Sequence, residues 1–122
     1  MNSATHESFA QGVLEIVGPD LDRSLAFYTS LGFDIERRTG PFAVLNGYRV
    51  RLFLAEDAAA PTGERWSNIR IIVADVDAVW QHVHELGLAP RHAIADRSYG
   101  LRDFTIADPS GFELRFAQVI AP

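Results

Sequence analysis

Residues 13–33 read VLEIVGPDLDRSLAFYTSLGF, and residues 68–88 read NIRIIVADVDAVWQHVHELGL. A shift of 55 positions places Asp20 on Asp75 and aligns the Leu-Gly pair that ends each stretch. In both copies apolar residues first alternate with polar ones, which predicts a strand, and then recur with helical spacing. The chain therefore repeats one strand–helix unit. Such an internal repeat indicates the architecture of the whole chain more strongly than the pattern of any single segment.

The helix in each copy has recognisable boundaries. Asp20 and Asp75 are suited to cap the helices, because an aspartate side chain accepts hydrogen bonds from the free N–H groups at a helix start. In the first helix Leu21, Leu25 and Tyr28 fall at i, i+4 and i+7 and form an apolar stripe. The second helix spans about 76–86 and has an apolar stripe of the same kind.

Three further strands follow each helix. Turn residues separate them, notably Thr39-Gly40-Pro41, Asn46-Gly47 and Asp108-Pro109-Ser110-Gly111. With the first strand of each copy at about 13–17 and 68–73, the predicted strands are 33–38, 42–46 and 49–55 in the first half and 89–95, 101–107 and 113–118 in the second.

This order predicts an α+β fold of two tandem βαβββ modules. We place module 1 at about 11–57, a linker at 58–67 and module 2 at about 68–118, within a single domain of residues 1–122. One helix can cover one face of a four-stranded sheet. The other face must meet a counterpart in the same chain or in a second chain, so we expect a curved mixed sheet with a concave ligand cleft.

The composition of the chain indicates which kinds of partner are not expected. The 122 residues are 48% hydrophobic and 22% charged, with a net charge of −5 and no cysteine. No basic stripe favours a nucleic acid, and no apolar run approaches the roughly 20 residues that cross a membrane. Residues 1–11 lack the apolar stretch of a signal peptide, so we expect a cytoplasmic protein. Residues 1–10 are compatible with a disordered tail or with an arm exchanged between two subunits.

Two runs carry a family resemblance. DLDRSLAFYTSLGF (20–33) and FTIADPSGFELRF (104–116) resemble the vicinal-oxygen-chelate superfamily, which holds glyoxalase I, extradiol dioxygenases, fosfomycin-resistance enzymes and bleomycin-resistance proteins. The resemblance extends from about Val13 to Gln118 and implies the paired βαβββ fold. It does not by itself select one activity, because one fold hosts many.

The resemblance implies four metal-ligand positions. Counting back from Asp20 and Asp75 gives Val13 and Asn68, and counting on from the turn glycines Gly47 and Gly111 gives Arg49 and Glu113. A divalent ion needs several anionic or neutral N and O donors. Valine offers no donor, arginine is a cation, and glutamate alone fits, so we expect no metal cofactor.

The absence of ligands resembles the bleomycin-resistance branch, as does the run RSYGLRDFTIADPSG (97–111). That likeness implies a homodimer that sequesters an antibiotic at the subunit interface, with no catalysis. The ligand would be a small molecule, cationic or aromatic. The alternatives are a glyoxalase- or dioxygenase-like enzyme holding one divalent metal ion at an atypical site with Glu113, and a protein-interaction module.

The candidate ligand-binding residues lie on the strand faces opposite the helix stripes and in the flanking loops. Trp66 and Tyr99 can stack on aromatic ligands or cover cations. Glu113 is expected to pair with an arginine, for which Arg49 across the pocket is the candidate. The full set is Glu15, Arg49, Arg51, Phe53, Trp66, Asn68, Tyr99, Asp103, Thr105, Glu113 and Arg115.

Overall fold

The computed structural model describes residues 10–120, so most of the N-terminal segment whose role the sequence leaves open lies outside the described residues. Two groups of elements follow each other in the same order. The first is β1 (Leu14–Gly18), α2 (Leu21–Leu31), β2 (Asp34–Thr39), β3 (Phe42–Gly47) and β4 (Val50–Glu56). The second is β5 (Asn68–Ile72), α3 (Val76–Glu85), β6 (His92–Asp96), β7 (Leu101–Ala107) and β8 (Glu113–Val119).

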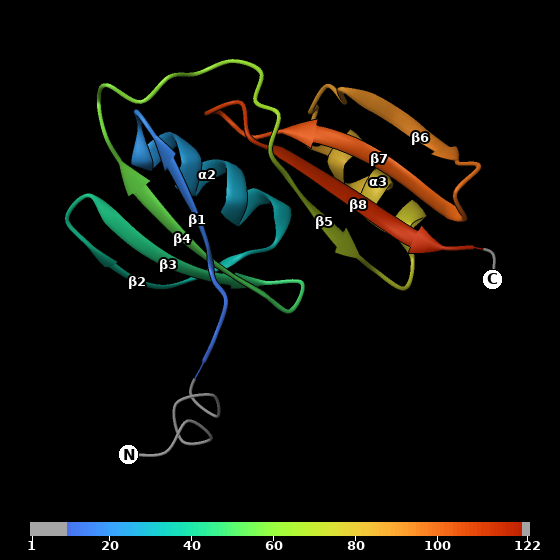
Figure 1. Ribbon diagram of the computed structural model, residues 1–122, viewed down its shortest axis with the longest axis horizontal. Coiled ribbons are helices and arrows are strands. Elements are labelled where there is room, and N and C mark those ends of the chain that lie inside the picture. The colour runs from blue at the N-terminus through green and yellow to red at the C-terminus, as the bar shows by residue number, and fades with distance from the viewer. Residues whose placement is uncertain (1–9, 121–122) are drawn as a thin grey trace.

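The strands form two mixed sheets of four. Sheet A has the order β1-β4-β3-β2 and sheet B the order β5-β8-β7-β6, with only the β1–β4 and β5–β8 pairs parallel. Both helices lie behind their sheets in Figure 1, which leaves the front of each sheet without a covering helix. The α+β class and the tandem modules are confirmed. The hydrogen bonds divide the expected curved sheet into two separate sheets.

One contact shows how closely the modules repeat. The backbone N–H of Leu21, at the start of α2, donates to Glu56 Oε1 at 2.9 Å. The N–H of Val76, at the start of α3, donates to Gln118 Oε1 at 3.0 Å. The helices are thus related by 55 positions, whereas the last strands are related by 62. The sequence separation between the helix start and the end of the last strand is therefore 42 positions in module 2 and 35 in module 1.

The helices form where the sequence predicts them. Asp20 and Asp75 each accept the N–H of the residue three positions later, at 3.1 Å, as capping aspartates do. The predicted stripe of α2 is buried, and it belongs to one apolar core that includes residues of both modules. Trp80 of α3 packs edge-on against Phe104, with ring centroids 5.1 Å apart.

Polar and aromatic contacts join the modules. Tyr28 of α2 donates its hydroxyl to Asp108 Oδ2 at 2.7 Å, and burial together with this carboxylate raises the pKa of Tyr28 well above its usual value. The other oxygen of Asp108 accepts the N–H groups of Ser110 and Phe112, which closes the β7–β8 turn. The Asp-Pro-Ser-Gly motif therefore fixes a turn and also anchors module 1.

The linker crosses this same turn. Gly111 has a φ of +90°, and a Cβ at this position would overlap the backbone of Gly63 in the linker. Figure 1 shows the linker passing over the molecule from the end of β4 to the start of β5. A glycine is required here because the conformation is left-handed and two backbones are in contact.

Two local predictions are wrong. The β3–β4 turn is at Tyr48 and Arg49, with φ of +51° and +60°, and Asn46-Gly47 belongs to β3. Two successive positive φ values in a two-residue loop are those of a type I′ turn, whose twist matches the twist of the flanking strands. Strand β6 starts at His92 rather than 89, since Pro90 has no N–H for a sheet ladder. No helix among residues 10–120 is long and apolar enough to cross a membrane.

Candidate functional site

The uncovered face of sheet B carries a buried carboxylate at its centre. Asp103 of β7 accepts hydrogen bonds from Arg70 Nη1 at 3.0 Å, Arg97 Nε at 2.7 Å and the Tyr99 hydroxyl at 2.8 Å. The Arg70 guanidinium also lies 5.5 Å from the centroid of the Tyr99 ring, within cation–π range. A single aspartate thus fixes three side chains, one from β5 and two from the connection between β6 and β7.

A second carboxylate lies on the same face. Glu113, at the start of β8, accepts from Arg91 Nη1 at 2.8 Å and lies 3.5 Å from Arg115 Nη2. The predicted pairing of Glu113 with Arg49 is wrong. Arg49 is exposed in a turn of module 1, and Arg91 and Arg115 of module 2 take both oxygens of the glutamate.

Both carboxylates remain ionised well into the acid range. Burial by itself raises the pKa of Asp103, but hydrogen bonds from Arg97 and Tyr99 outweigh burial and leave the pKa lowered. The pKa of Glu113 is lowered in the same way, with burial opposed by Arg91 and Arg115. These groups are therefore acceptors for arginine and not proton donors at neutral pH.

A hollow of about 200 Å³ opens on this face. It brings together four residues of the candidate set from β7, β8 and the β6–β7 turn. His92 and Arg97 complete its lining, although neither belongs to the candidate set. The candidate residues in it are Tyr99, Asp103, Thr105 and Arg115.

Two arginines on the uncovered faces have a donor without a partner. The Nε atoms of Arg51 and Arg115 are the only buried side-chain nitrogen or oxygen atoms among the described residues that lack a hydrogen-bond partner. A buried donor left unsatisfied costs about 1–3 kcal/mol. Arg51 lies on β4 and Arg115 on β8, so the same strand of each module carries such a donor.

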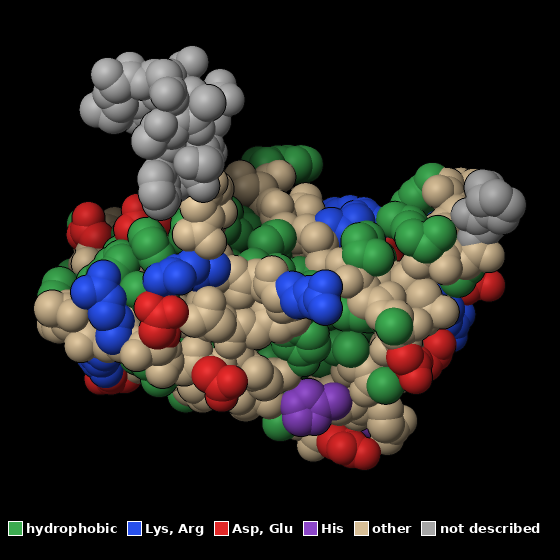
Figure 2. All heavy atoms as spheres, turned by 90° about the horizontal axis from the view of Figure 1, so that it is seen from below, with side chains coloured by type: hydrophobic (Ala, Val, Ile, Leu, Met, Phe, Trp, Pro, Cys, Tyr) green, Lys and Arg blue, Asp and Glu red, His purple; other side chains and the backbone are tan. Residues whose placement is uncertain are grey.

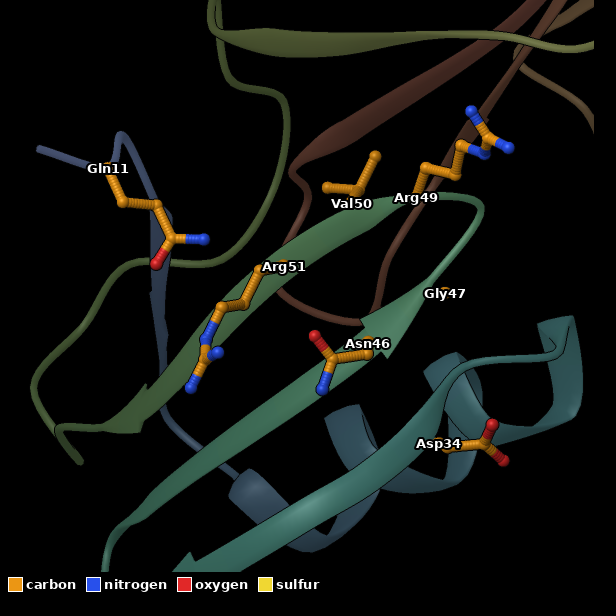
Figure 3. A pocket seen from close by; sticks show the side chains of 7 residues that line it. All are labelled: Gln11, Asp34, Asn46, Gly47, Arg49, Val50 and Arg51. Atoms are coloured by element: carbon orange, nitrogen blue, oxygen red, sulfur yellow. The ribbon is translucent and has the colours of Figure 1, made fainter. Parts of the chain in front are cut away.

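A larger hollow of about 460 Å³ lies on module 1. Its arginines do not converge: in Figure 3 the side chains of Arg49 and Arg51 extend in opposite directions. Arg51 Nη2 donates to Glu36 Oε2 at 2.9 Å, and Glu36 also accepts from Asn46. The residues around this hollow are Gln11, Asp34, Asn46, Gly47, Arg49, Val50 and Arg51.

The register of the ladders corrects one metal-ligand position. Leu52 pairs with Leu14 in sheet A, as Leu114 pairs with Ile69 in sheet B. The equivalent of Glu113 is therefore Arg51. Counting from a turn glycine gave Arg49, because the β3–β4 loop has two residues and the β7–β8 loop has five.

The corrected set does not fit a divalent ion. Val13, Arg51, Asn68 and Glu113 supply one carboxylate, and arginines hold both of its oxygens. Asn68 is exposed and pairs with Glu113 in the strand ladder. Among residues 10–120 no three histidine, cysteine, aspartate or glutamate side chains are grouped as a metal site would need.

The remaining candidates are dispersed. Glu15 is exposed on β1 and pairs with Phe53, whose ring packs edge-on against Phe42 at 5.1 Å. Trp66 is 98% exposed in the linker, and Tyr99 is 55% exposed beside the hollow. Neither Glu15, Phe53 nor Trp66 lines the two hollows described above.

Of the four arginines that bind the two carboxylates, the sequence analysis included Arg115 and missed Arg70, Arg91 and Arg97. Arg70 lies two positions after Asn68, and alternation puts both on the same strand face, but nothing in the sequence marks Arg70 as functional. Arg97 opens the run 97–111, which resembles the bleomycin-resistance branch. Arg91 precedes β6 and had no signal, because its ion pair with Glu113 spans 22 positions.

The comparisons with known proteins agree with this architecture. The model of the Glyoxalase/Bleomycin resistance protein/Dioxygenase superfamily matches residues 10–116, which is most of the chain. The protein belongs to this superfamily.

Within this superfamily, the chain is similar to bleomycin resistance proteins. The chain is 31% identical over 119 residues to the bleomycin resistance proteins of Geobacillus stearothermophilus and Staphylococcus aureus, with 83% of this chain and 90% of each relative covered. Among solved structures, a bleomycin-binding protein complexed with bleomycin has a TM-score of 0.78 at 23% identity, over 89% of this chain and 98% of that one. A transposon-encoded bleomycin resistance determinant has a TM-score of 0.79 at 23% identity, over 90% and 98%.

Proposed function

We propose that this protein binds a small-molecule antibiotic of the bleomycin type and sequesters it in a cleft between two subunits. We propose that it does so in the cytoplasm and without catalysing a reaction of the antibiotic. The observation that carries the proposal is the hollow on the uncovered face of sheet B. The Arg97 and Tyr99 side chains that line it are already fixed by Asp103, as a binding site with little reorganisation requires. Bleomycin resistance proteins are the curated relatives at 31% identity.

The donor set supports binding without a metal ion. Arg51 brings a fixed positive charge to one ligand position, and Val13 offers no donor atom at another. Glu113 would have to leave both Arg91 and Arg115 before it could coordinate an ion. We therefore propose no bond chemistry, and nothing in the donor set favours the alternative of a metalloenzyme using Glu113.

Open edges and apolar residues support a second subunit. β1 and β5 are edge strands of their sheets within the described chain, and an unpaired edge is a surface for another strand or subunit. Ile72, Val119 and Ile120 are exposed by 54%, 61% and 41%. Figure 2 shows hydrophobic side chains gathered beside the C-terminal end of the chain. A copy packed there would cover these residues and enclose the uncovered faces.

The proposal is tested by titrating the protein with bleomycin, with binding measured by calorimetry and by the change in melting temperature. Stoichiometric binding with a raised melting temperature is expected, and Tyr99→Ala is expected to weaken binding. Arg102→Gln is the matched control, because Arg102 pairs with Asp77 and Asp96 on the helix side of the same sheet. Unchanged melting at saturating bleomycin would exclude the proposed ligand.

Two further measurements address the parts of the proposal separately. Sedimentation is expected to give a dimer, and a monomer that binds bleomycin fully would contradict the interface cleft. Elemental analysis after purification without chelators is expected to find far less than one divalent ion per chain. A stoichiometric metal ion would contradict metal-free binding.

A further inference from the structure

The backbone of Tyr99 is held by a tight turn between β6 and β7. The N–H of Gly100 donates to the Arg97 carbonyl at 3.1 Å, and the N–H of Arg97 donates to the Leu101 carbonyl at 2.7 Å. The carbonyl of Gly100 also accepts the N–H of Ile120 at 3.1 Å. The chain is therefore fixed on both sides of Tyr99, and what is left to determine is the rotation of its side chain.

The side chain of Tyr99 needs contacts of its own to stay in one orientation. The residue is 55% exposed and lines the hollow of about 200 Å³ on the uncovered face of sheet B. An exposed aromatic side chain can occupy several staggered rotamers. A ligand that packs on such a ring must first immobilise it, and this loss of freedom weakens binding.

Arg70 of β5 contacts the two groups that determine this orientation. Its guanidinium lies 5.5 Å from the centroid of the Tyr99 ring, within cation–π range. Its Nη1 donates at 3.0 Å to Asp103 Oδ2, the same oxygen that accepts the Tyr99 hydroxyl at 2.8 Å. Arg70 thus packs over the ring and also binds the acceptor of its hydroxyl group.

The carboxylate that Arg70 and Tyr99 share is itself fixed. The side chain of Asp103 is 5% exposed, and its Oδ1 accepts from Arg97 Nε at 2.7 Å. Burial opposes the ionisation of Asp103, but hydrogen bonds from Arg97 and Tyr99 leave its pKa lowered. The acceptor therefore stays charged at neutral pH, and both side chains are held against a rigid anchor.

Arg70 differs from its neighbours in where it lies relative to the hollow. Tyr99, Arg97 and Asp103 line the hollow, and within the described chain Arg70 is not among the lining residues. The Arg70 guanidinium also occupies one face of the Tyr99 ring, which leaves the other face and the edge to a ligand. Arg70 can therefore influence a flat ligand in the hollow through the ring, without touching that ligand.

We propose that Arg70 is a positioning residue for ligand binding: it holds the Tyr99 ring in one orientation, in which the ring packs against a flat group of the ligand. For the identity of the ligand this inference rests on the proposed function. Tyr99 makes the contact with the ligand, and Arg70 determines the direction in which the ring faces before the ligand arrives.

The orientation of Tyr99 is measured first, in the protein without ligand. NMR coupling constants between the Hα and Hβ protons report the χ1 rotamers of the side chain. We expect one rotamer in the wild type and a mixture in Arg70→Gln. Arg102→Gln is the matched control, because it makes the same change of charge on the helix side of the same sheet, and it is expected to keep one rotamer.

Calorimetric titration with bleomycin then tests whether this orientation matters for binding. Arg70→Gln is expected to lower the affinity roughly threefold to tenfold, the cost of immobilising one side chain on binding. In a Tyr99→Ala background the same substitution is expected to cause no further loss, because Arg70 acts through the ring. If Arg70 only stabilised the fold, the loss would be the same in both backgrounds.

Arg70→Lys separates the shape of the side chain from its charge, and it also serves if Arg70→Gln folds poorly. Lysine keeps a positive charge beside Asp103, but it has no planar guanidinium to lie over the ring and bind the carboxylate together. Arg70→Lys is therefore expected to retain part of the affinity and part of the rotamer preference.

The outcomes separate the positioning role from the proposed function. A single Tyr99 rotamer in Arg70→Gln, or an equal loss of affinity with and without the Tyr99 ring, overturns the positioning role. Equal affinity of wild type and Arg70→Gln for bleomycin also overturns it and leaves the proposed function standing. If bleomycin does not bind the wild type, the proposed function is overturned, and the Tyr99 rotamers alone decide the role of Arg70.

Discussion

The two modules share a backbone pattern and differ in chemistry on their uncovered faces. In module 1 two aromatic rings pack edge-on there, with centroids 5.1 Å apart. In module 2 the matching positions carry a buried aspartate and an arginine. Ladder register fixes the correspondence, which is Phe42 with Asp103, Val44 with Thr105, and Phe53 with Arg115.

This difference separates the residues that specify the fold from those that specify the ligand. The buried strand residues that face the helices are apolar in both modules and belong to one core. The same helix–strand contact recurs at Leu21 with Glu56 and at Val76 with Gln118. The uncovered faces carry no such constraint, so each can hold a different chemistry on the same strands.

The largest effect is expected at the turn beneath the linker. Gly111→Ala should lower the free energy of unfolding by about 3 kcal/mol or more, because the conformation is left-handed and the new methyl group overlaps Gly63. Gly40→Ala in the open β2–β3 turn of module 1 should cost only about 1–2 kcal/mol. Urea unfolding of both variants measures the difference, and equal losses would show that the linker does not restrict Gly111.

The next effect concerns the charged centre of module 2. Asp103→Ala should lower the free energy of unfolding by about 2–3 kcal/mol, since it removes the acceptor of Arg70, Arg97 and Tyr99. Its counterpart, Phe42→Ala, should cost about 1–2 kcal/mol through lost apolar contact alone. Chemical denaturation gives both values. If the free energy of unfolding of the Asp103 variant equals that of the wild type, the hydrogen bonds around Asp103 do not stabilise the fold.

A smaller effect is expected from pH. The folded pKa of Asp103 lies below the roughly 3.9 of an unfolded aspartate, so its ionisation stabilises the fold fully above about pH 5. This contribution is lost as the pH falls through the lowered folded pKa. The stability gap between wild type and Asp103→Asn, measured by urea unfolding, should therefore shrink from pH 6 to pH 3. A gap of constant size would contradict this assignment.

The smallest effect is expected in the linker. Trp66→Ala should change the free energy of unfolding by no more than about 0.5 kcal/mol, because the side chain is almost fully exposed. Trp80→Ala should be clearly destabilising, since Trp80 packs on Phe104 in the core. Thermal unfolding of the two variants provides the comparison. A large loss for Trp66→Ala would assign this residue a structural contact.

Sequence reasoning predicted the elements well, because each helix had a capping aspartate, an apolar stripe and a Leu-Gly end. It placed Tyr99, Asp103, Thr105 and Arg115 in one set, and the structure places them around one hollow. Period-two alternation was enough for the three strand residues, since neighbouring strands of a sheet bring residues of the same face together, whereas Tyr99 was chosen as a loop aromatic within the run that carries the resemblance.

The errors have a common physical origin in loops and long-range pairs. Arg49 was counted from a turn glycine, but the two modules close their last hairpins with loops of different length. The sequence analysis predicts a partner for Glu113 in module 1, whereas Arg91 binds it from within module 2. Neither a loop length nor a non-local ion pair leaves a periodic signal in one sequence.

The contrasting environments of the two tryptophans make the protein its own optical reporter. Trp66 is almost fully hydrated, whereas Trp80 is partly buried against Phe104. Because these are the only two indoles in the chain, fluorescence emission divides into a red-shifted component that acrylamide quenches readily and a blue-shifted component that it reaches poorly. Changes at the linker and changes in the core of module 2 can thus be followed separately in the unlabelled protein.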